Sequence, residues 1–354
     1  MQKQNKQQAR FYVGSYTHPE GHVPNACGSG IYRGLINLDS GEIELTVAYE
    51  GIKNPSYIDV DQETKQVYAI EEVEGKSNVA QLLNMNGDTL ICASEQSTLS
   101  EASCHVFKHK NSLYVASYVG GSLTQHKIEG DQLLSGKLIN YTGSGPNPAR
   151  QEASHAHQSI ASPDDRWLYV CDLGSDRIWC HDLQKPFSEP TQSIVIPPGY
   201  GPRHLCFHPY LSKVFAICEM AGIILVFDYD ANTGALNLSN EHNSLPSDYT
   251  ELPSSGAIRI HPSGHALYVS NRGHESVGAF AIDKGGQLES MGWVNSGGVS
   301  PRDFNIDPSG QWLLTANQDS HTITVFKINE ETKAIDESSI KSYECKSPCC
   351  IVFT

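Results

Sequence analysis

Positive charge and long apolar runs are both scarce in this sequence of 354 residues. Lys and Arg number 25 against 40 Asp and Glu, so the net charge is −15, and the nine arginines form no cluster along the chain. Binding to nucleic acid depends on clustered positive charge, so we expect no nucleic-acid partner. An acidic exterior mainly favours solubility.

No apolar stretch reaches the length of about 18 residues that a bilayer-spanning helix needs. Residues 1–10 are polar, rich in Gln and Lys, and lack the apolar core of a secretion signal. We therefore expect no membrane contact, a cytoplasmic location, a flexible tail over residues 1–10 and one domain over residues 11–354.

Paired cysteines and hydrolase motifs are missing as well. The ten cysteines stand singly within strand-like segments, without a Cys-x-x-Cys spacing, and are expected to be buried, reduced thiols. The adjacent Cys349 and Cys350 would point to opposite faces of a strand and do not suit a disulfide. No Gly-x-Ser-x-Gly sequence occurs, so serine-hydrolase chemistry lacks support.

What the sequence does contain is a repeat. A short strand, a turn with Pro, Asp or Gly, and a strand of the form Tyr-Val-x-x recur at intervals of about 46 to 53 residues, the size of a four-stranded propeller blade. The clear copies begin at His157, Arg203, Gly256 and Arg302, and weaker ones begin at Ser56 and Cys104. The strands are short, β-branched and aromatic, as in all-β proteins.

The two chain ends complete the count of blades. Residues 347–354 resemble a first strand without a second, and residues 11–17 resemble a second strand without a first. Joined, they form a seventh blade and remove exposed sheet edges. We therefore predict an all-β fold: a seven-bladed β-propeller of four-stranded antiparallel blades, closed by its N- and C-terminal strands.

The first strand of each blade lines the channel of a propeller, so equivalent positions form rings around it. The first such column holds Ser56, Cys104, His157, Arg203, Gly256, Arg302 and Cys349; the second holds Tyr16, Glu72, Tyr118, Leu173, Glu219, Arg272 and Gln318. Strand cores are normally apolar at regular points, whereas these columns are rich in ionisable residues. A shared cavity could bind an anion and move protons.

Each candidate has two interpretations. Arg203, Arg272 and Arg302 can capture a phosphate or carboxylate; alternatively, Arg203 or Arg272 can tie neighbouring blades together through Asp or Glu. Glu219 can be a general acid or base, with a pKa raised by a partly dry pocket, or an ion-pair partner of Arg272. His157 can transfer a proton or donate to a carbonyl oxygen.

Three further residues are assigned to substrate binding together with Arg302. They are His155, Gln318 and His204, the last of which lies one position beyond the first column and is expected in a supporting role. His155 and His157 share one face of a strand and could pair on a metal, but no third ligand motif accompanies them, so we expect neither a metal nor a cofactor. The Gly- and Pro-containing segment 141–158 is expected to form a loop over the channel mouth, or else a plain surface excursion.

Taken together, these phrases resemble a known family. GPRHLCFHP (201–209), CEM (218–220), SNRG (270–273), SPRDFNIDPSGQWLLTANQ (300–318) and HAHQSIASPDDRWLYV (155–170) resemble the propeller-type lactonases. That family contains bacterial 6-phosphogluconolactonases and the fungal carboxy-cis,cis-muconate cyclase, and the resemblance runs from Phe11 to Phe353. The resemblance implies that the site residues are His157, Arg203, Glu219 and Arg272, and the Pro-Arg pair at Arg302 also matches.

The resemblance implies hydrolysis of 6-phospho-D-glucono-1,5-lactone to 6-phosphogluconate, in the pentose phosphate pathway of glucose metabolism, without a metal or organic cofactor. The arginines would hold the phosphate and polarise the carbonyl, and Glu219 or His157 would activate water. Two alternatives stay open because one scaffold hosts several activities: a muconate-type cycloisomerase and a non-catalytic interaction propeller. The expected partner is a small anionic lactone, and a homo-oligomer is possible.

Overall fold

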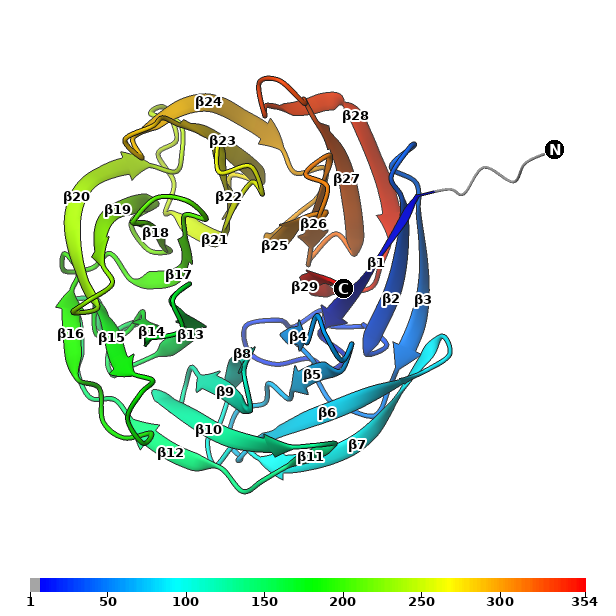
Figure 1. Ribbon diagram of the computed structural model, residues 1–354. Helices are drawn as coiled ribbons and strands as arrows, with labels where there is room; N and C mark the ends of the chain where they lie inside the picture. The colour runs from blue at the N-terminus through cyan, green and yellow to red at the C-terminus, as the bar shows by residue number, and fades with distance from the viewer. Residues whose placement is uncertain (1–6) are drawn as a thin grey trace.

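The computed structural model describes residues 7–354, which form seven antiparallel β-sheets arranged in a ring (Figure 1). Within this range no residue is helical, and no helix could therefore span a membrane. Each sheet is a blade whose strands lie side by side from the channel outward. The predicted all-β, seven-bladed fold is confirmed.

The blades use the following strands, given from the innermost to the outermost. The first is β29 (Pro348–Phe353), β1 (Gln8–Ser15), β2 (Ile31–Asn37) and β3 (Ile43–Tyr49); the second is β4 (Ile58–Val60), β5 (Val67–Ile70), β6 (Val79–Asn86) and β7 (Thr89–Ser97). The third is β8 (Ser103–His109), β9 (Ser112–Ser117), β10 (Ser122–Glu129) and β12 (Lys137–Asn140), with the short β11 (Gln132–Leu133) also on β10.

The remaining four blades follow the same order. They are β13 (Ala156–Ala161), β14 (Trp167–Asp172), β15 (Arg177–Asp182) and β16 (Gln192–Val195); β17 (Pro202–Phe207), β18 (Lys213–Cys218), β19 (Ile223–Asp230) and β20 (Ala235–Asn243); β21 (Ser254–Ile260), β22 (Ala266–Arg272), β23 (Ser276–Ile282) and β24 (Leu288–Asn295); and β25 (Pro301–Ile306), β26 (Trp312–Asn317), β27 (Thr322–Ile328) and β28 (Ile335–Glu344).

The last strand closes the ring. β29 pairs with β1 antiparallel, from Phe11 opposite Phe353 to Ser15 opposite Pro348, which confirms the blade built from both chain ends. β1 begins at Gln8, so the strand takes in three residues that the sequence assigned to a flexible tail. Residues 1–6 of that predicted tail lie outside the described residues.

Tryptophan side chains stabilise two of the seams, that is, the contacts between neighbouring blades. Trp312 of β26 packs in a buried cluster with Phe11 and Ile351 of the closing blade, and its indole N–H donates to the Leu38 carbonyl at 2.9 Å. Trp167 of β14 donates in the same way to the Ala231 carbonyl of the next blade, also at 2.9 Å. These two seams thus combine apolar burial with one directional hydrogen bond each.

The cysteines follow the prediction with exceptions. All ten are free thiols, and Cys349 and Cys350 reach different carbonyls, those of Ser56 and Ile58. Seven are buried as expected, but Cys92 and Cys206 are only half-buried, and Cys27, in the connection between β1 and β2, is exposed.

Candidate active site

A β-bulge turns one residue of the inner strand toward the channel in six of the blades. At these points the inner strand carries extra residues that the neighbouring strand does not match, and such bulges re-aim side chains next to functional sites. The skipped residues are Cys104, His157, Arg203, Gly256 with Ala257, Arg302 and Cys349. They coincide with the first column read from the sequence, whose remaining member, Ser56, lies just before β4.

The second column is held against the first by backbone hydrogen bonds. In six blades the amide of the second-column residue donates to the carbonyl two residues before the first-column residue. These bonds are Tyr16 to Ser347 (3.0 Å), Glu72 to Asn54 (3.1 Å), Tyr118 to Ala102 (2.8 Å), Leu173 to His155 (3.0 Å), Glu219 to Gly201 (2.8 Å) and Gln318 to Ser300 (2.9 Å). In the seventh, Arg272 lies opposite Ser254 in the strand ladder.

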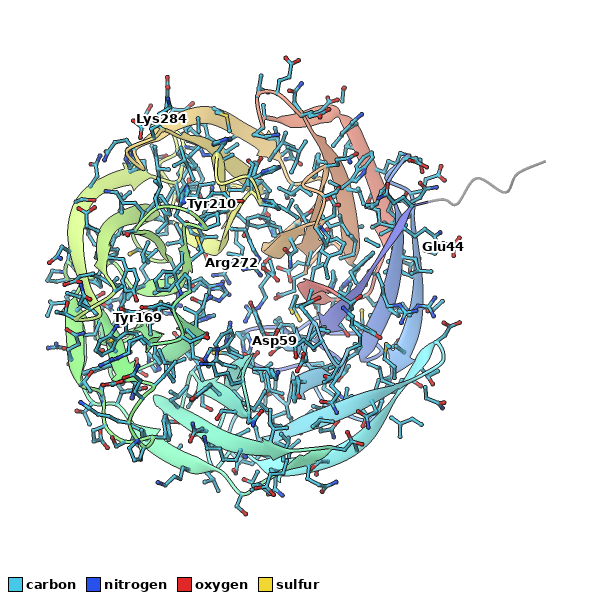
Figure 2. All side chains as sticks on the ribbon, in the orientation of Figure 1. Glu44, Asp59, Tyr169, Tyr210, Arg272 and Lys284 are labelled. Atoms are coloured by element: carbon cyan, nitrogen blue, oxygen red, sulfur yellow. The ribbon has the colours of Figure 1, made fainter. Side chains whose placement is uncertain are left out.

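Eight of the fourteen residues of the two columns line a pocket of about 440 Å³, a volume suited to a small metabolite. Figure 2 places Arg272 near the centre of the ring. The polar residues that line the pocket are His22, Glu72, Glu74, Cys104, Tyr118, Arg150, His157, Glu219, Ser254, Arg272, Ser300, Arg302, Gln318 and Asp319.

Glu219 is surrounded by three guanidinium groups. Its carboxylate lies 2.6 Å from Arg150, 3.0 Å from Arg203 and 2.7 Å from Arg272. Burial alone would raise the pKa of Glu219, but Arg272, Arg203 and Arg150 together hold that pKa far below its usual value. The prediction of a raised pKa is therefore wrong: Glu219 is a permanent carboxylate that positions arginines, and a poor proton acceptor.

A second carboxylate lies across the pocket. Glu72 accepts a hydrogen bond from the Tyr16 hydroxyl at 2.9 Å and lies 3.3 Å from His22 and 3.9 Å from Arg302. Burial would raise the pKa of Glu72, but His22 and Arg302 lower it to about 2. Glu72 is thus ionised at neutral pH as well, and it anchors Arg302 only through a long contact.

His157 supplies a neutral base between these charges. Its ring is buried, and burial together with the charge of Arg203 lowers the pKa of His157 well below 6.5, against the opposing pull of Glu219. The Nδ1 atom has no protein hydrogen-bond partner within residues 7–354. A neutral imidazole beside several guanidinium groups can accept a proton and is flanked by donors for a developing oxyanion.

The structure brings most of the predicted residues together. His157, Glu219, Arg272, Arg302 and Gln318 line the pocket. Arg203 is buried beneath it and reaches it through its ion pair with Glu219.

Two predicted substrate-binding residues lie elsewhere. His155 stacks on Tyr118 with ring centroids 4.4 Å apart, and its nitrogens contact the Tyr118 carbonyl at 2.9 Å and Glu152 at 3.1 Å. It therefore forms no ligand pair with His157, and no group of three metal-ligating side chains occurs in residues 7–354. His204 lies behind His157, with ring centroids 5.1 Å apart, and is not among the residues that line the pocket.

Sequence reasoning missed Arg150. It belongs to segment 141–158, which does reach the channel, and its guanidinium contacts Glu219 and the Tyr118 hydroxyl. Arg150 stands outside the blade repeat, so no column could identify it. The second column contains Glu72, Tyr16 and Tyr118. Their contacts with His22, Arg302 and Arg150 depend on side-chain reach, which a column of backbone positions does not predict.

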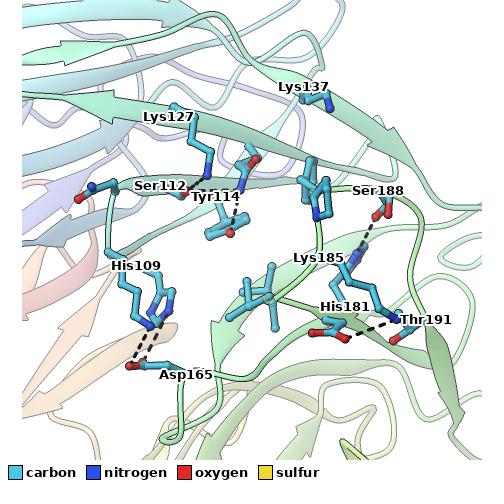
Figure 3. A pocket seen from close by; sticks show the side chains of 18 of the residues that line it. His109, Ser112, Tyr114, Lys127, Lys137, Asp165, His181, Lys185, Ser188 and Thr191 are labelled. Atoms are coloured by element: carbon cyan, nitrogen blue, oxygen red, sulfur yellow. Dashed lines mark hydrogen bonds and ion pairs between the residues drawn. The ribbon is translucent and has the colours of Figure 1, made fainter.

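A second cleft, of about 460 Å³, lies between the blade of β8–β12 and the blade of β13–β16 (Figure 3). It is lined by lysines and has no arginine among its lining residues. Lys110 pairs with Asp165 at 3.1 Å and Lys185 with Asp182 at 3.5 Å, so these charges compensate one another. The central pocket, with its base and its arginines, is the better candidate for catalysis.

Comparison with known families gives a clear result. Residues 10–353 match the model of the lactonase family described as a seven-bladed β-propeller. The chain belongs to this lactonase family. The resemblance read from the sequence phrases is thereby confirmed, over nearly the whole chain.

Individual relatives of this lactonase-family propeller cover most of its length. It is 31% identical over 337 residues to a 6-phosphogluconolactonase of Formosa agariphila, covering 91% of this chain and 93% of the relative. It is 26% identical over 327 residues to a 6-phosphogluconolactonase of Bacillus subtilis, covering 91% of each chain. Among solved structures, a candidate 6-phosphogluconolactonase from Bacteroides fragilis superposes with a TM-score of 0.90 at 27% identity, over 100% of this chain and 99% of that one.

Proposed function

We propose that this lactonase-family protein hydrolyses a small anionic sugar lactone, most specifically 6-phospho-D-glucono-1,5-lactone to 6-phosphogluconate. The names of two relatives support the substrate, and the charges of the central pocket support the chemistry. The proposal depends above all on one residue, Arg302.

Arg302 carries donors that the protein leaves available. Its side chain is 12% exposed, its guanidinium stacks over the Tyr16 ring at 5.2 Å, and its carboxylate contact with Glu72 is 3.9 Å long. Arg272, by contrast, is fixed by Glu219 and by the carbonyls of Ser254 and Ser255. A planar guanidinium held by stacking and free of a close carboxylate suits bidentate binding of a phosphate.

The remaining groups account for lactone opening. A water molecule transfers a proton to Nε2 of His157, and its oxygen attacks the lactone carbonyl carbon. Guanidinium groups held by Glu219 stabilise the oxyanion. The bond between this carbon and the ring oxygen then breaks, the ring oxygen takes the remaining proton of the attacking water from the new acid group, and the carboxylate that forms lies beside the arginines. Lactones open spontaneously, so modest electrostatic and base catalysis is sufficient.

Comparing phosphorylated with unphosphorylated gluconolactone tests the role of Arg302. For Arg302→Ala we expect kcat/KM to fall about 100-fold on the phosphorylated substrate, the loss of about two charge-assisted hydrogen bonds. On the unphosphorylated lactone the change should be small. Arg302→Lys should recover part of the loss, because it keeps the charge but not the bidentate geometry.

The control is Arg177→Ala, on the outer part of a blade, where the guanidinium contacts Ser193 and Trp179. It should leave both rates unchanged. An equal loss of Arg302→Ala on both lactones would contradict phosphate binding by Arg302. Turnover of carboxymuconate by the wild type, without lactone hydrolysis above background, would overturn the proposed function.

A further inference from the structure

Three histidine rings lie close to one another behind the pocket. His157 lies 5.1 Å from His204, and His204 lies 5.8 Å from His105, measured between ring centroids. His105 in turn packs against Tyr57 with ring centroids 4.2 Å apart, and Tyr57 also lies 6.1 Å from His204. The rings come from three adjacent inner strands, β13, β17 and β8, and all three histidines are buried.

Their nitrogens lack protein partners. Within residues 7–354, Nδ1 of His157, both nitrogens of His204 and Nδ1 of His105 are buried without a protein hydrogen bond. Leaving a buried polar atom unpaired costs about 1–3 kcal/mol, so such atoms normally have a protein or water partner. Four such atoms on these three neighbouring rings point to a chain of buried water molecules that bridges the rings.

The charges around these three rings keep the rings neutral. Burial and the guanidinium groups of Arg203 and Arg259 lower the pKa of His204 and of His105 well below 6.5. Arg259 itself is neutralised by Asp303 at 3.0 Å. A neutral imidazole has one donor and one acceptor nitrogen, so it can take a proton on one side and release one on the other.

The three histidine rings also connect the pocket to a more exposed part of the channel. Tyr57 and Arg259, at the end away from the pocket, are partly exposed, whereas the three histidines are not. Lactone hydrolysis turns one neutral ester and one water into a hydroxy-carboxylate and one proton. The product carboxylate is held by the arginines at the mouth, while burial beside Arg203 disfavours a lasting positive charge on His157.

We propose that His204 and His105, with buried water between them, form a proton relay behind His157. The proposal rests on the proposed lactonase function. Nε2 of His157 receives the proton of the attacking water, and Nδ1–H passes a proton to the bridging water. That water protonates one nitrogen of His204, the opposite nitrogen releases its proton toward His105, and one proton leaves near Tyr57. No oxidant or further reactant takes part.

The test compares His204→Leu with His126→Leu. His126 matches it as a buried histidine with an unpartnered Nε2, but it lies on β10, and its Nδ1 bonds the Leu134 carbonyl. For His204→Leu we expect kcat to fall about 10-fold, the low end of acid–base contributions, with KM unchanged and a changed solvent deuterium isotope effect. His126→Leu should keep kcat and the isotope effect. His204→Gln should restore the bridging water but not the transfer, and thus little of kcat.

Two measurements do not depend on activity. A high-resolution crystal structure of the wild type should show ordered water within hydrogen-bond distance of His157 Nδ1 and of His204. The ¹⁵N resonances of His157 should shift in His204→Leu and not in His126→Leu. Absence of this water, or wild-type kcat and isotope effect in His204→Leu, would overturn the relay. If the wild type lacked lactonase activity while the water chain was present, the proposed function would fail and the water-bridged histidines would remain.

Discussion

The charge state of each group in the pocket is decided by its immediate neighbours. Glu219 and Glu72 are both buried, yet surrounding cations keep both ionised, whereas His157 is kept neutral by burial and a nearby guanidinium. The acid–base assignment follows from this contrast: two carboxylates arrange arginines, and one imidazole is free to accept a proton.

This assignment predicts how the rate depends on pH. The pKa of His157 is lowered, so its base form persists below pH 6.5, and the lowered pKa values of Glu72 and Glu219 keep both carboxylates ionised down to about pH 4. We expect kcat for enzymatic lactone hydrolysis, corrected for spontaneous opening, to stay nearly constant from about pH 7.5 to pH 5.5.

Saturating substrate should be used, since a phosphate monoester itself ionises near pH 6 and would affect KM. Unphosphorylated gluconolactone, which lacks that ionisation, serves as the control. A decline of kcat with a midpoint near 6.5 on both substrates would contradict the neutral, low-pKa state of His157.

How far the site could be predicted also differs from residue to residue. His157, Arg272 and Arg302 could be placed because they recur at fixed offsets in the blade repeat. Arg150 could not, since it comes from a loop without a repeat, and the pKa of Glu219 could not, since it depends on which side chains reach the carboxylate. Offsets along the chain predict which backbone positions lie close together, but the length and rotamer of each side chain decide which side chains form ion pairs or hydrogen bonds.

At the scale of strands, the bulges of the inner strands are the feature that the sequence does not predict. At Cys104, His157 and Arg203 the inner strand carries one residue that the neighbouring strand does not match. The strands themselves were predictable from β-branched runs and turn residues. The bulges were not, because a single extra residue leaves no compositional trace.

The seams between blades give a prediction at this scale. Gly41, in the turn between β2 and β3, has φ +73°, and an added Cβ would overlap the ring of Trp312 from the preceding blade. Gly75 has φ +75° with no atom near an added Cβ. Gly75→Ala should cost about 1 kcal/mol through backbone strain. Gly41→Ala should cost about 1–3 kcal/mol more, because it also overpacks the seam.

Urea unfolding of both variants beside the wild type measures the difference, since the backbone strain is shared and cancels. Equal free energies of unfolding for the two variants would mean that the Trp312 seam tolerates displacement and does not hold the closing blade.

At the scale of the whole molecule, ring closure and the pocket are coupled. β29 pairs with β1, and Tyr16, just after β1, donates its amide N–H to Ser347 and its hydroxyl to Glu72, while its ring supports Arg302. The closing blade could be predicted because each chain end carries the strand that the other lacks. Its link to Arg302 could not, because that link depends on how far the side chains of Tyr16, Glu72 and Arg302 reach.

Closure by β29 should therefore be essential, while the position of the chain ends should not. The Thr354 amide donates to the Arg10 carbonyl at 3.0 Å, so β29 and β1 can be joined as a hairpin. A permutant that links Thr354 to Met1, with new ends between Gly87 and Asp88 in an exposed turn, keeps every strand pair. We expect it to fold, to stay monodisperse in size-exclusion chromatography and to retain kcat.

The matching test removes the closing strand. A chain that ends at Ser347 lacks β29, which covers β1, so we expect it to aggregate through the exposed edge of β1. A folded and active chain without β29 would show that six blades and an open edge suffice, against the coupling of closure to Glu72 and Arg302.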